Sequence, residues 1–313
     1  MNFDINKLKG GRYMNYKKLS IVVIPTLLLS LFAMVPINRS YNKKEPWMSK
    51  VNDNVRLVDL SIPGTHDSGA THSIFDVAGK CQDTTIRQQL NMGTRFFDLR
   101  LVLNNEEFKI IHGQVDQILK FKKVLKELTS YVKENPSEFL LISIKEESGS
   151  VNSSRSFEEV LLEDLNEYEE VISFSNELPQ TVKEARGKIH ILSRYNLSFG
   201  YPSYYGWSDD TTFVLDDLYV QDNYCIDDVE EKKQDIISTI NVSNNLNNNY
   251  LVINFTSCYL DNAFPPSYAG TAARDINPWF ISYIKEHKHD KLGIIVIDFM
   301  SEELSEAIYR RNY

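Results

Sequence analysis

The segment SIPGTHDSGA at residues 61–70 brings a histidine and an aspartate together, His66 and Asp67, directly after the apolar run VRLVDL. The chain has 6 histidines, and a second one, His112, ends another apolar run in FKIIHG. Histidine titrates close to neutral pH, so its side chain can take up or release a proton under physiological conditions. These residues are therefore candidates for proton-transfer chemistry.

Charged and polar residues recur on segments that are otherwise apolar enough to be buried strands. Such residues are candidates for catalysis, because barrel enzymes collect their active-site residues at the carboxyl ends of the strands. For each one taken alone, a hydrogen-bonded core residue or a solvated strand end is the alternative. The residues are His66 and Asp67 after the first strand, Asp98 and Arg100 on the second, His112 at the end of the third, Lys145 at the end of the fourth, Arg194 at the end of the fifth and Asp298 on the last.

Short apolar runs alternate with longer amphipathic segments from Ser49 onward. Strands are predicted at 56–62, 95–103, 108–113, 139–145, 188–194, 250–257 and 292–300, and helices at 85–93, 121–136, 157–172, 230–246 and 277–288. Strands that are apolar on both faces and separated by helices indicate parallel β/α units. The number of units favours a closed barrel over an open sheet, so we predict an α/β fold with a single distorted (β/α)8 TIM barrel at 46–313.

Residues 1–45 differ from the rest of the chain and are predicted to direct export. A basic stretch is followed by an uncharged apolar run at 19–35 and then by polar residues, which is the order of a secretory signal peptide. Pro25 interrupts the run and no clear cleavage motif follows it, so an uncleaved membrane anchor is an alternative, and a buried core helix is another. We expect a protein that is secreted, or tethered by this segment to the outer face of the cytoplasmic membrane.

The 313 residues are 42% hydrophobic and 25% charged, which is enough apolar material for one large core. A formal net charge of -9 argues against a nucleic-acid-binding protein, because phosphate backbones recruit an excess of lysine and arginine. The 3 cysteines, Cys81, Cys225 and Cys258, form no C-x-x-C pair. One disulfide could form in an exported chain, but small buried side chains are favoured, and no cysteine-based metal site is indicated.

The chain resembles the bacterial phosphatidylinositol-specific phospholipases C over about residues 50–313. The resemblance rests on an ordered series of motifs: LSIPGTHDSGA, GTRFFDLRL, IIHGQ, NPSEFLLISIKEE, ARGKIHILSRY, YVQDNY, INFTS and IIVIDFM. GTHDS alone is shared with the catalytic X region of related phospholipases C, whereas the full ordered set is much more specific. The resemblance implies cleavage of phosphatidylinositol to diacylglycerol and inositol 1,2-cyclic phosphate.

The resemblance also implies a role for each candidate in that reaction. His66 matches the general base that takes the proton from the inositol 2-hydroxyl, and His112 matches the acid that protonates the leaving diacylglycerol oxygen. Asp298 matches the carboxylate that fixes the tautomer of the base and stabilises its charged form. Asp67 is expected to pair with the acid or with the groups around the phosphate.

Arg100 matches the cation that binds the phosphate oxygens, on which charge builds up in the transition state. Calcium-dependent relatives carry an acidic metal ligand at this position of FFDLRL, so the resemblance implies that no metal cofactor is needed. Contacts to the inositol ring are implied for Lys145, Arg194, Asp222, Tyr224 and Asp98, with the tyrosine offering its ring face for stacking.

Membrane contact is expected from apolar and aromatic residues at the rim of the site. The segment THSIFDVAGKC is shorter than the helix that usually carries such residues in the family, and the negative net charge would weaken attraction to anionic lipid. The candidates are Ile74, Phe75, Trp207 and Phe264, for each of which core packing is the alternative. We expect a monomer that associates peripherally with membranes containing phosphatidylinositol, and glycosyl-phosphatidylinositol anchors are possible further substrates.

Two other functions stay open at this point. A metal-dependent glycerophosphodiester phosphodiesterase would also be a barrel, but it would need a cluster of acidic metal ligands, and Arg100 argues against one. A non-catalytic lipid-binding surface protein would have no use for the acid–base pair of His66 and His112. The remaining histidines are left out of the site: His72, His190, His287 and His289.

Overall fold

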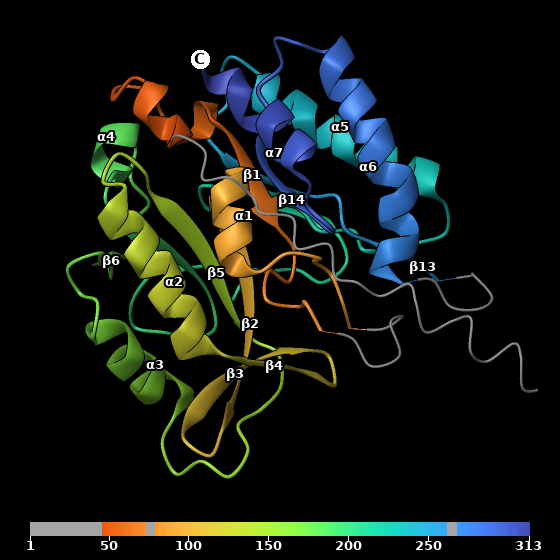
Figure 1. Ribbon diagram of the computed structural model, residues 1–313. Coiled ribbons are helices and arrows are strands. Elements are labelled where there is room, and N and C mark those ends of the chain that lie inside the picture. Colours follow the sequence, from red (N-terminus) through yellow and green to blue (C-terminus); the bar gives the residue numbers. More distant parts are fainter. Residues whose placement is uncertain (1–45, 73–78, 262–267) are drawn as a thin grey trace, which may run out of the picture. The chain divides into compact units, whose positions relative to one another are not determined.

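The computed structural model describes residues 46–72, 79–261 and 268–313 (Figure 1). The export segment predicted at 1–45 lies outside these residues, so both the segment and the start of the barrel domain at residue 46 stay predictions. None of the helices in the described ranges is long and apolar enough to cross a membrane.

A 12-stranded sheet forms the centre of the described residues. Its main path runs β7-β5-β2-β1-β14-β12-β10, and every neighbouring pair on the path is parallel. The last strand of the chain returns to lie beside the first, which is the arrangement of a barrel rather than of a doubly wound sheet. The path strands are β1 (Ser61–Thr65), β2 (Phe96–Asn104), β5 (Leu140–Glu146), β7 (Ile189–Arg194), β10 (Leu218–Gln221), β12 (Leu251–Phe255) and β14 (Gly293–Ile297).

The barrel is incompletely closed. β8 (Tyr201–Pro202) pairs with one edge of β7, beside the short β6 (Ile172–Ser173), and β9 (Thr212–Leu215) pairs antiparallel with β10. No pairing joins β8 to β9 or β10 in the residues that the structure describes. The predicted distorted barrel is therefore confirmed, and its distortion includes an open seam between β8 and β9.

The strand predicted at 108–113 exists but is not a barrel strand. β3 (Glu107–His112) pairs antiparallel with the end of β2 and with β4 (Val115–Lys120). Asn105 and Glu106 have φ values of 52° and 61°, as a two-residue hairpin turn requires, so the chain reverses directly after β2. A short apolar run has the same appearance in a hairpin and in a barrel strand, which explains the error. The hairpin carries His112 back toward the carboxyl ends of the barrel strands.

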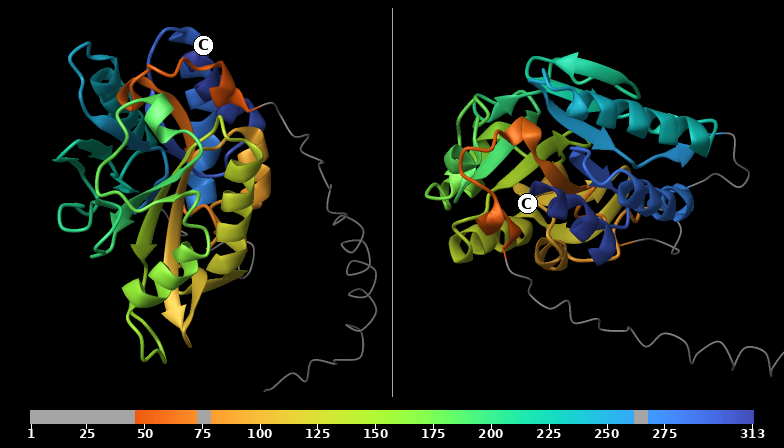
Figure 2. Two further views of the ribbon diagram at one scale, coloured as in Figure 1. Left: turned by 90° about the vertical axis from the view of Figure 1, so that its left-hand side faces the viewer. Right: turned by 90° about the horizontal axis from the view of Figure 1, so that it is seen from above.

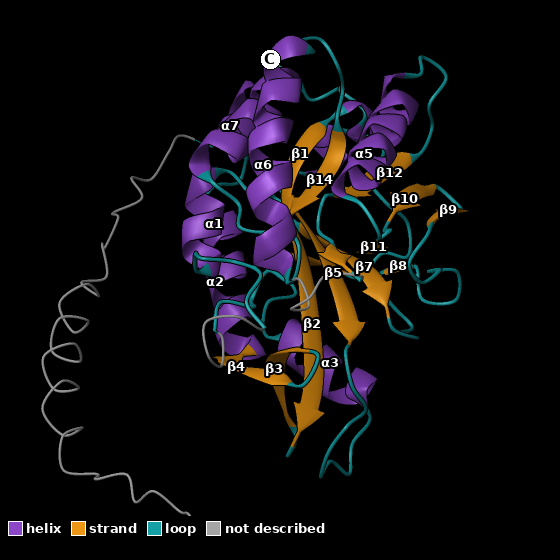
Figure 3. Cartoon of the chain, turned by 90° about the vertical axis from the view of Figure 1, so that its right-hand side faces the viewer, coloured by secondary structure: helices purple, strands orange, loops and turns teal. Residues whose placement is uncertain are grey.

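Five helices follow one another as packed neighbours on the outside of the strands (Figures 1 and 3). They are α2 (Phe121–Glu134), α1 (Ile86–Met92), α7 (Glu302–Tyr309), α6 (Ala269–Glu286) and α5 (Val229–Asn244). In Figure 2, α5 lies along the outer side of β12. Among the elements not predicted from the sequence are α7, β4, β9 and β10, and α6 begins earlier than the helix predicted at 277–288.

Local sequence explains where several helices begin. Thr85 and Ser156 each form a capping box with a glutamine or glutamate three residues later, which satisfies the free N–H groups of the first turn of α1 and of α3 (Phe157–Asn166). Gly93 ends α1 with a φ of 112°, a left-handed conformation that glycine adopts without strain. Thr181 caps the short α4 (Val182–Ala185).

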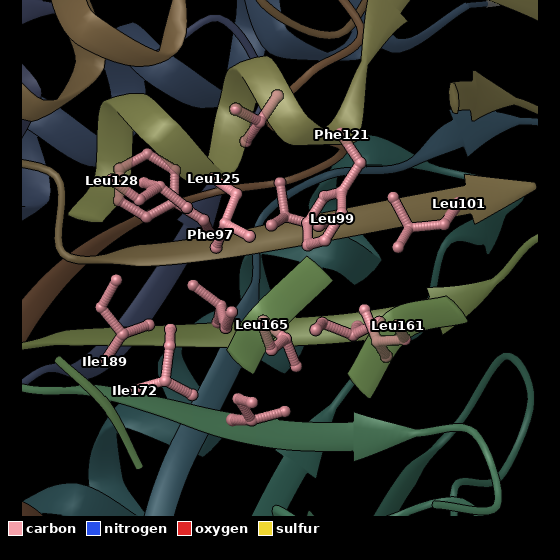
Figure 4. Packing of buried hydrophobic residues seen from close by; sticks show 14 of the residues in the cluster. Phe97, Leu99, Leu101, Phe121, Leu125, Leu128, Leu161, Leu165, Ile172 and Ile189 are labelled. Carbon is pink, nitrogen blue, oxygen red and sulfur yellow. The ribbon is translucent and has the colours of Figure 1, made fainter. Parts of the chain in front are cut away.

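The packing of α2 on β2 holds the outer layer to the sheet (Figure 4). Leu125 and Leu128 of the helix lie over Phe97 and Leu99 of the strand, and all of them are fully buried. Burying one such side chain stabilises the fold by about 1.5–3 kcal/mol. This packing fixes the strand whose other face carries Asp98 and Arg100, because side chains alternate along a strand.

A buried ion pair lies at the amino ends of β2 and β5. Arg95 Nε donates to Glu138 Oε2 at 2.6 Å, and the side chains of the two residues are 1% and 0% exposed. Glu138 also accepts the backbone N–H of Met48, and Arg95 donates to the hydroxyl of Tyr131. The pair therefore joins the chain entering the barrel to the base of two central strands.

We expect Arg95→Met to lower the free energy of unfolding by about 3–5 kcal/mol, because the Glu138 carboxylate is left buried without its partner. Urea unfolding followed by circular dichroism measures the loss. Lys285→Met is the matched control, since Lys285 pairs with Glu303 at 2.9 Å where both side chains are more than half exposed, and such pairs contribute at most about 1 kcal/mol. Equal losses in the two variants would contradict the assignment.

Candidate active site

A cavity of ≈ 360 Å³ lies at the carboxyl ends of the barrel strands, the end at which β2, β5 and β7 terminate in Figure 3. Its lining includes many of the residues predicted from the sequence: His66, Arg100, His112, Lys145, Arg194, Asp222, Tyr224 and Asp298. The other lining residues are Cys81, Glu147, Asp209, Ser257, Cys258, Tyr259, Tyr268 and Ala269. The candidates that the sequence scattered along the chain thus meet at one site.

His66 and Asp298 each follow a barrel strand directly, and the pairing of β1 with β14 brings them side by side. His66 Nδ1 lies 2.8 Å from Asp298 Oδ1, and Arg100 Nη2 lies 2.7 Å from His66 Nε2. A guanidinium can only donate, so Nε2 accepts and the ring proton sits on Nδ1, from which it is donated to Asp298. The lone pair of His66 therefore points at the guanidinium of Arg100.

Asp67 links the two histidines through Arg100. Its Oδ2 lies 3.3 Å from Arg100 Nε and 3.6 Å from His112 Nε2. Asp67 is fully buried and has a φ of 41°, a left-handed conformation that aspartate tolerates better than most residues. The contacts run from His66 through Arg100 and Asp67 to His112, so both proton-transfer candidates flank one guanidinium.

Three cations occupy one row of the sheet. The strand register pairs Arg100 with Lys145 and Lys145 with Arg194. Parallel neighbours in register project their side chains to the same face, and all three line the cavity. Such a row suits an anion together with a hydroxyl-rich ligand.

Asp98 lies behind this row and does not line the cavity. It is fully buried, with its carboxylate 3.2 Å from Arg100 Nε and 3.7 Å from Arg194 Nη1, and it accepts the backbone N–H of Asp67. The resemblance implied a direct substrate contact for Asp98, whereas the structure places it where it orients two arginines. Its buried charge is stabilised by these cations.

Arg194, Asp222 and Tyr224 form a second part of the wall, and Trp207 contacts the first two of them. The Arg194 guanidinium lies 3.9 Å from the centre of the Trp207 ring, and Trp207 Nε1 donates to Asp222 Oδ2 at 3.1 Å. The Tyr224 hydroxyl donates to Asp209 at 2.8 Å, and Tyr224 lines the cavity. This part therefore combines a stacked cation, a carboxylate and an aromatic ring.

Of the four residues predicted to contact the membrane, the structure describes only Trp207. Trp207 is partly buried and held by Arg194 and Asp222, so the structure gives it a place in the site, and its contact with a membrane stays a prediction. Ile74, Phe75 and Phe264 lie outside the described residues.

The charges of the site shift its protonation equilibria. Burial and the charge of Arg100 lower the pKa of His66, but the charge of Asp298, the hydrogen bond to it and the charge of Asp67 together raise that pKa above 6.5. Burial raises the pKa of Asp67. Burial also opposes the charges of Asp98 and Arg100, yet the neighbouring arginines lower the pKa of Asp98 and the neighbouring carboxylates raise the pKa of Arg100, so both groups stay charged.

Glu147 was missed by the sequence analysis. Its carboxylate lies 2.8 Å from Lys145 Nζ and 3.5 Å from Arg100 Nη1, and it accepts the backbone N–H of Gly113 beside His112. Burial alone would raise the pKa of Glu147, but Arg100 and Lys145 lower it. Its position two residues after Lys145, on the same face of an extended chain, was the available signal.

Among the residues that the structure describes, two groups of side chains could each offer three donor atoms to a metal ion: His66, Cys81 and Asp298, and Asp67, Cys81 and His112. Both need Cys81, whose thiol is buried and has a pKa raised well above 9.0 by burial and by nearby carboxylates. A protonated thiol is a poor ligand, and the charge of Arg100 lies between the two groups. These donor sets therefore do not suit a cation.

Two of the three cysteines are buried as the sequence indicated, and His190 and His287 lie away from the cavity. Cys81 and Cys258 are buried free thiols, and Cys225 is free and partly buried. His190 is buried in the core with Nε2 3.0 Å from the carbonyl oxygen of Ala185, while His287 follows the end of α6 at an exposed position.

Comparisons with known proteins agree with a barrel of the phospholipase C type. The family model described as "Phosphatidylinositol-specific phospholipase C, X domain" matches residues 44–195. The 1-phosphatidylinositol phosphodiesterase of Listeria monocytogenes is 26% identical over 96% of this chain and 99% of its own length. The Staphylococcus aureus protein of the same name is 27% identical over 90% of this chain and 92% of its own.

Solved structures show the same relationship. A variant of the S. aureus phosphatidylinositol-specific phospholipase C superposes with a TM-score of 0.74 at 25% identity, covering 85% of this chain and 98% of that one. The L. monocytogenes enzyme superposes with a TM-score of 0.69 at 25% identity over the same shares. Residues 44–195 thus match the X domain of the phosphatidylinositol-specific phospholipases C, and nearly the whole chain is similar to enzymes of that family.

We expect Asp298→Asn to lower the pKa of His66, because the negative charge that favours the imidazolium is removed while the ring stays buried. Titration of the imidazole Cε1 protons by NMR measures the shift. His190 is the internal control, since burial lowers its pKa and Asp298 takes no part in that effect. An unchanged or raised pKa of His66 would contradict the proposed pairing.

Proposed function

We propose that the chain cleaves phosphatidylinositol by intramolecular attack, releasing diacylglycerol and inositol 1,2-cyclic phosphate. The observation that carries the proposal is the pair of histidines, His66 and His112, on either side of Arg100 and Asp67 at one cavity. Such a site holds a base, an acid and an anion-binding cation together. The names of the relatives, 1-phosphatidylinositol phosphodiesterase, support the choice of substrate.

His66 is the proposed general base. Its Nε2 takes the proton of the inositol 2-hydroxyl as that oxygen attacks phosphorus, while the hydrogen bond from Nδ1 to Asp298 keeps the lone pair on Nε2 and stabilises the imidazolium that forms. Without substrate, Arg100 donates to this same Nε2. The phosphate offers the guanidinium a charged acceptor, so substrate binding would free the lone pair for the hydroxyl.

Arg100 is the proposed binding group for the phosphate. Negative charge grows on the non-bridging oxygens as the fifth bond to phosphorus forms, and a planar guanidinium can donate to two of them. Asp67 and Asp98 both lie within 3.3 Å of Arg100 Nε, so the cation is oriented before the substrate arrives. A group that needs no reorientation loses little of its binding energy to ordering.

His112 is the proposed general acid. As the bond from phosphorus to the diacylglycerol oxygen breaks, His112 gives that oxygen a proton and diacylglycerol leaves as a neutral alcohol. Asp67, 3.6 Å from His112 Nε2, orients the ring. One proton is gained by His66 and one is lost by His112, so the pair in exchanged roles can hydrolyse the cyclic phosphate in a slower second reaction.

The inositol ring is proposed to bind against Lys145, Arg194, Asp222 and Tyr224. Charged donors and a carboxylate satisfy ring hydroxyls, and the aromatic ring packs on the apolar face of the inositol. All four residues line the cavity that also holds the two histidines.

We further propose that the reaction needs no metal ion, because Arg100 supplies the positive charge at the phosphate. A glycerophosphodiester phosphodiesterase would need a cluster of acidic metal ligands instead. A non-catalytic lipid-binding protein is the other alternative, and it gives no reason for the ordered His66–Asp298 pair.

We also propose that the protein is a monomer, either secreted or tethered to the outer face of the cytoplasmic membrane by the segment at 1–45, that binds phosphatidylinositol-containing membranes peripherally. Membrane binding of the similar S. aureus phosphatidylinositol-specific phospholipase C can be modulated, which supports peripheral association for this chain. Glycosyl-phosphatidylinositol anchors contain the same scissile bond and are proposed as further substrates.

Incubation with phosphatidylinositol vesicles in excess EDTA should produce the phosphorus NMR signal of a five-membered cyclic phosphate, because the proposed reaction uses no metal and passes through the 2-hydroxyl. Loss of the signal on chelation, with recovery on adding calcium, would favour the metal-dependent alternative. Vesicle binding without any water-soluble phosphate product would favour the non-catalytic one.

His66→Ala and His112→Ala should each lower kcat by about 10²–10⁴-fold, because each removes one of the two proton-transfer groups. Initial rates on phosphatidylinositol in detergent micelles measure the effect. His289→Ala, an exposed histidine beyond α6, is the matched control and should retain the parent rate. A near-parent rate in a folded His66 or His112 variant would remove that residue from the mechanism.

A further inference from the structure

Lys232 is fully buried in α5, although lysine is rarely found without solvent contact. Its Nζ donates to the side-chain oxygen of Gln221 at 2.8 Å and to the backbone carbonyl oxygen of Asn223. Both acceptors belong to the segment Gln221, Asp222, Asn223 and Tyr224, here called the 221–224 segment. A buried amine therefore contacts the stretch that carries two of the proposed inositol contacts.

Gln221 and Asn223, the two residues that Lys232 contacts, make further hydrogen bonds. Gln221 Oε1 accepts the backbone N–H of Asn223 at 2.8 Å, and Gln221 Nε2 donates to Asn254 Oδ1 and to the carbonyl oxygen of Phe255, each at 2.8 Å. Asn223 Nδ2 donates to Asp235 of α5 at 2.8 Å. Lys232 thus belongs to a buried polar network that ties the end of β10 to β12 and α5.

The other side of the segment is held by the loop before β9. Asp210 Oδ1 accepts the backbone N–H groups of Tyr224 and Cys225 at 2.8 and 2.9 Å, and Thr211 accepts that of Asp222 at 3.1 Å. The segment begins at the last residue of β10, where both ladders of that strand end, with Gln221 opposite Thr212 of β9 and Asn254 of β12. Beyond Gln221, hydrogen bonds from α5 and from the loop before β9 therefore hold the segment in place of a strand ladder.

We propose that Lys232 is a positioning residue for inositol recognition: its hydrogen bonds hold the 221–224 segment so that the Asp222 carboxylate and the Tyr224 ring face the cavity. This inference rests on the proposed function of that cavity. Burying an amine costs free energy that an apolar side chain of similar volume would not. The lysine gives the segment a donor at this point, which an apolar side chain could not, and its hydrogen bond fixes the backbone carbonyl of Asn223.

Lys232→Met tests the proposal by removing the donor and keeping the length of the side chain. With inositol 1,2-cyclic phosphate as a soluble substrate, KM should rise by about tenfold, the effect of one lost or misaligned hydrogen bond, while kcat changes by less than about threefold. The dissociation constant of myo-inositol, measured by NMR titration, should rise in parallel. Lys232→Gln keeps a shorter donor and should give intermediate values.

Lys233→Met is the matched control, because Lys233 Nζ contacts Glu230 and the ring of Trp279 and makes no contact with the 221–224 segment. Its KM should stay at the parent value, and the unfolding temperature of every variant should be recorded. A Lys232→Met variant with parent KM and parent affinity for myo-inositol, whatever its unfolding temperature, would overturn the proposal. Failure of the unmodified protein to cleave phosphatidylinositol would overturn the proposed function, and the myo-inositol titration would then still report on Lys232.

Discussion

The buried guanidinium of Arg100 is the group on which the rest of the site depends. Asp67, Asp98 and Glu147 approach it from three segments of the chain, and His66 accepts from its free end. Taking these charges out of water is costly, and the cost is offset only while each charge keeps its partners at short range. The charges therefore restrict the site to one arrangement, and that arrangement places His66 and His112 on either side of the phosphate-binding cation.

The fold delivers these charges by two different routes. Arg100, Lys145 and Arg194 come from adjacent parallel strands in register, so the sheet itself sets their spacing. His112 comes from outside the barrel path, on an antiparallel hairpin that returns to the site and is fastened by the hydrogen bond from Gly113 to Glu147. A regular β/α unit would have carried the chain to the outer layer after β2. The barrel has two irregularities, the hairpin and the open seam. At both of them the chain departs from the standard fold in a way that helps to form the site.

The proposed chemistry explains why the protein supplies no nucleophile of its own. The inositol 2-hydroxyl lies next to the phosphorus that it attacks, so the reacting atoms are already joined by the substrate. The protein has only to move two protons and to stabilise charge on the phosphate oxygens. Fixed dipoles and charges on rigid strands suit that task better than mobile loops, because they need no reorganisation during the reaction.

The sequence alone was sufficient to predict the barrel class and most of its strands and helices, because strand periodicity is a local property. The position of a residue at a strand end is also local, so the sequence could predict which residues would lie together at one cavity: His66, His112, Arg100, Asp298, Lys145 and Arg194. It did not separate the β3–β4 hairpin from a barrel strand, and it missed α7, β9 and β10. It also did not distinguish Asp98, which lies behind the wall, from residues on the wall, and it overlooked Glu147 and Lys232. Those distinctions depend on which side chains from distant segments come into contact and on which charged groups are thereby removed from water. Only the folded chain decides these contacts and this burial.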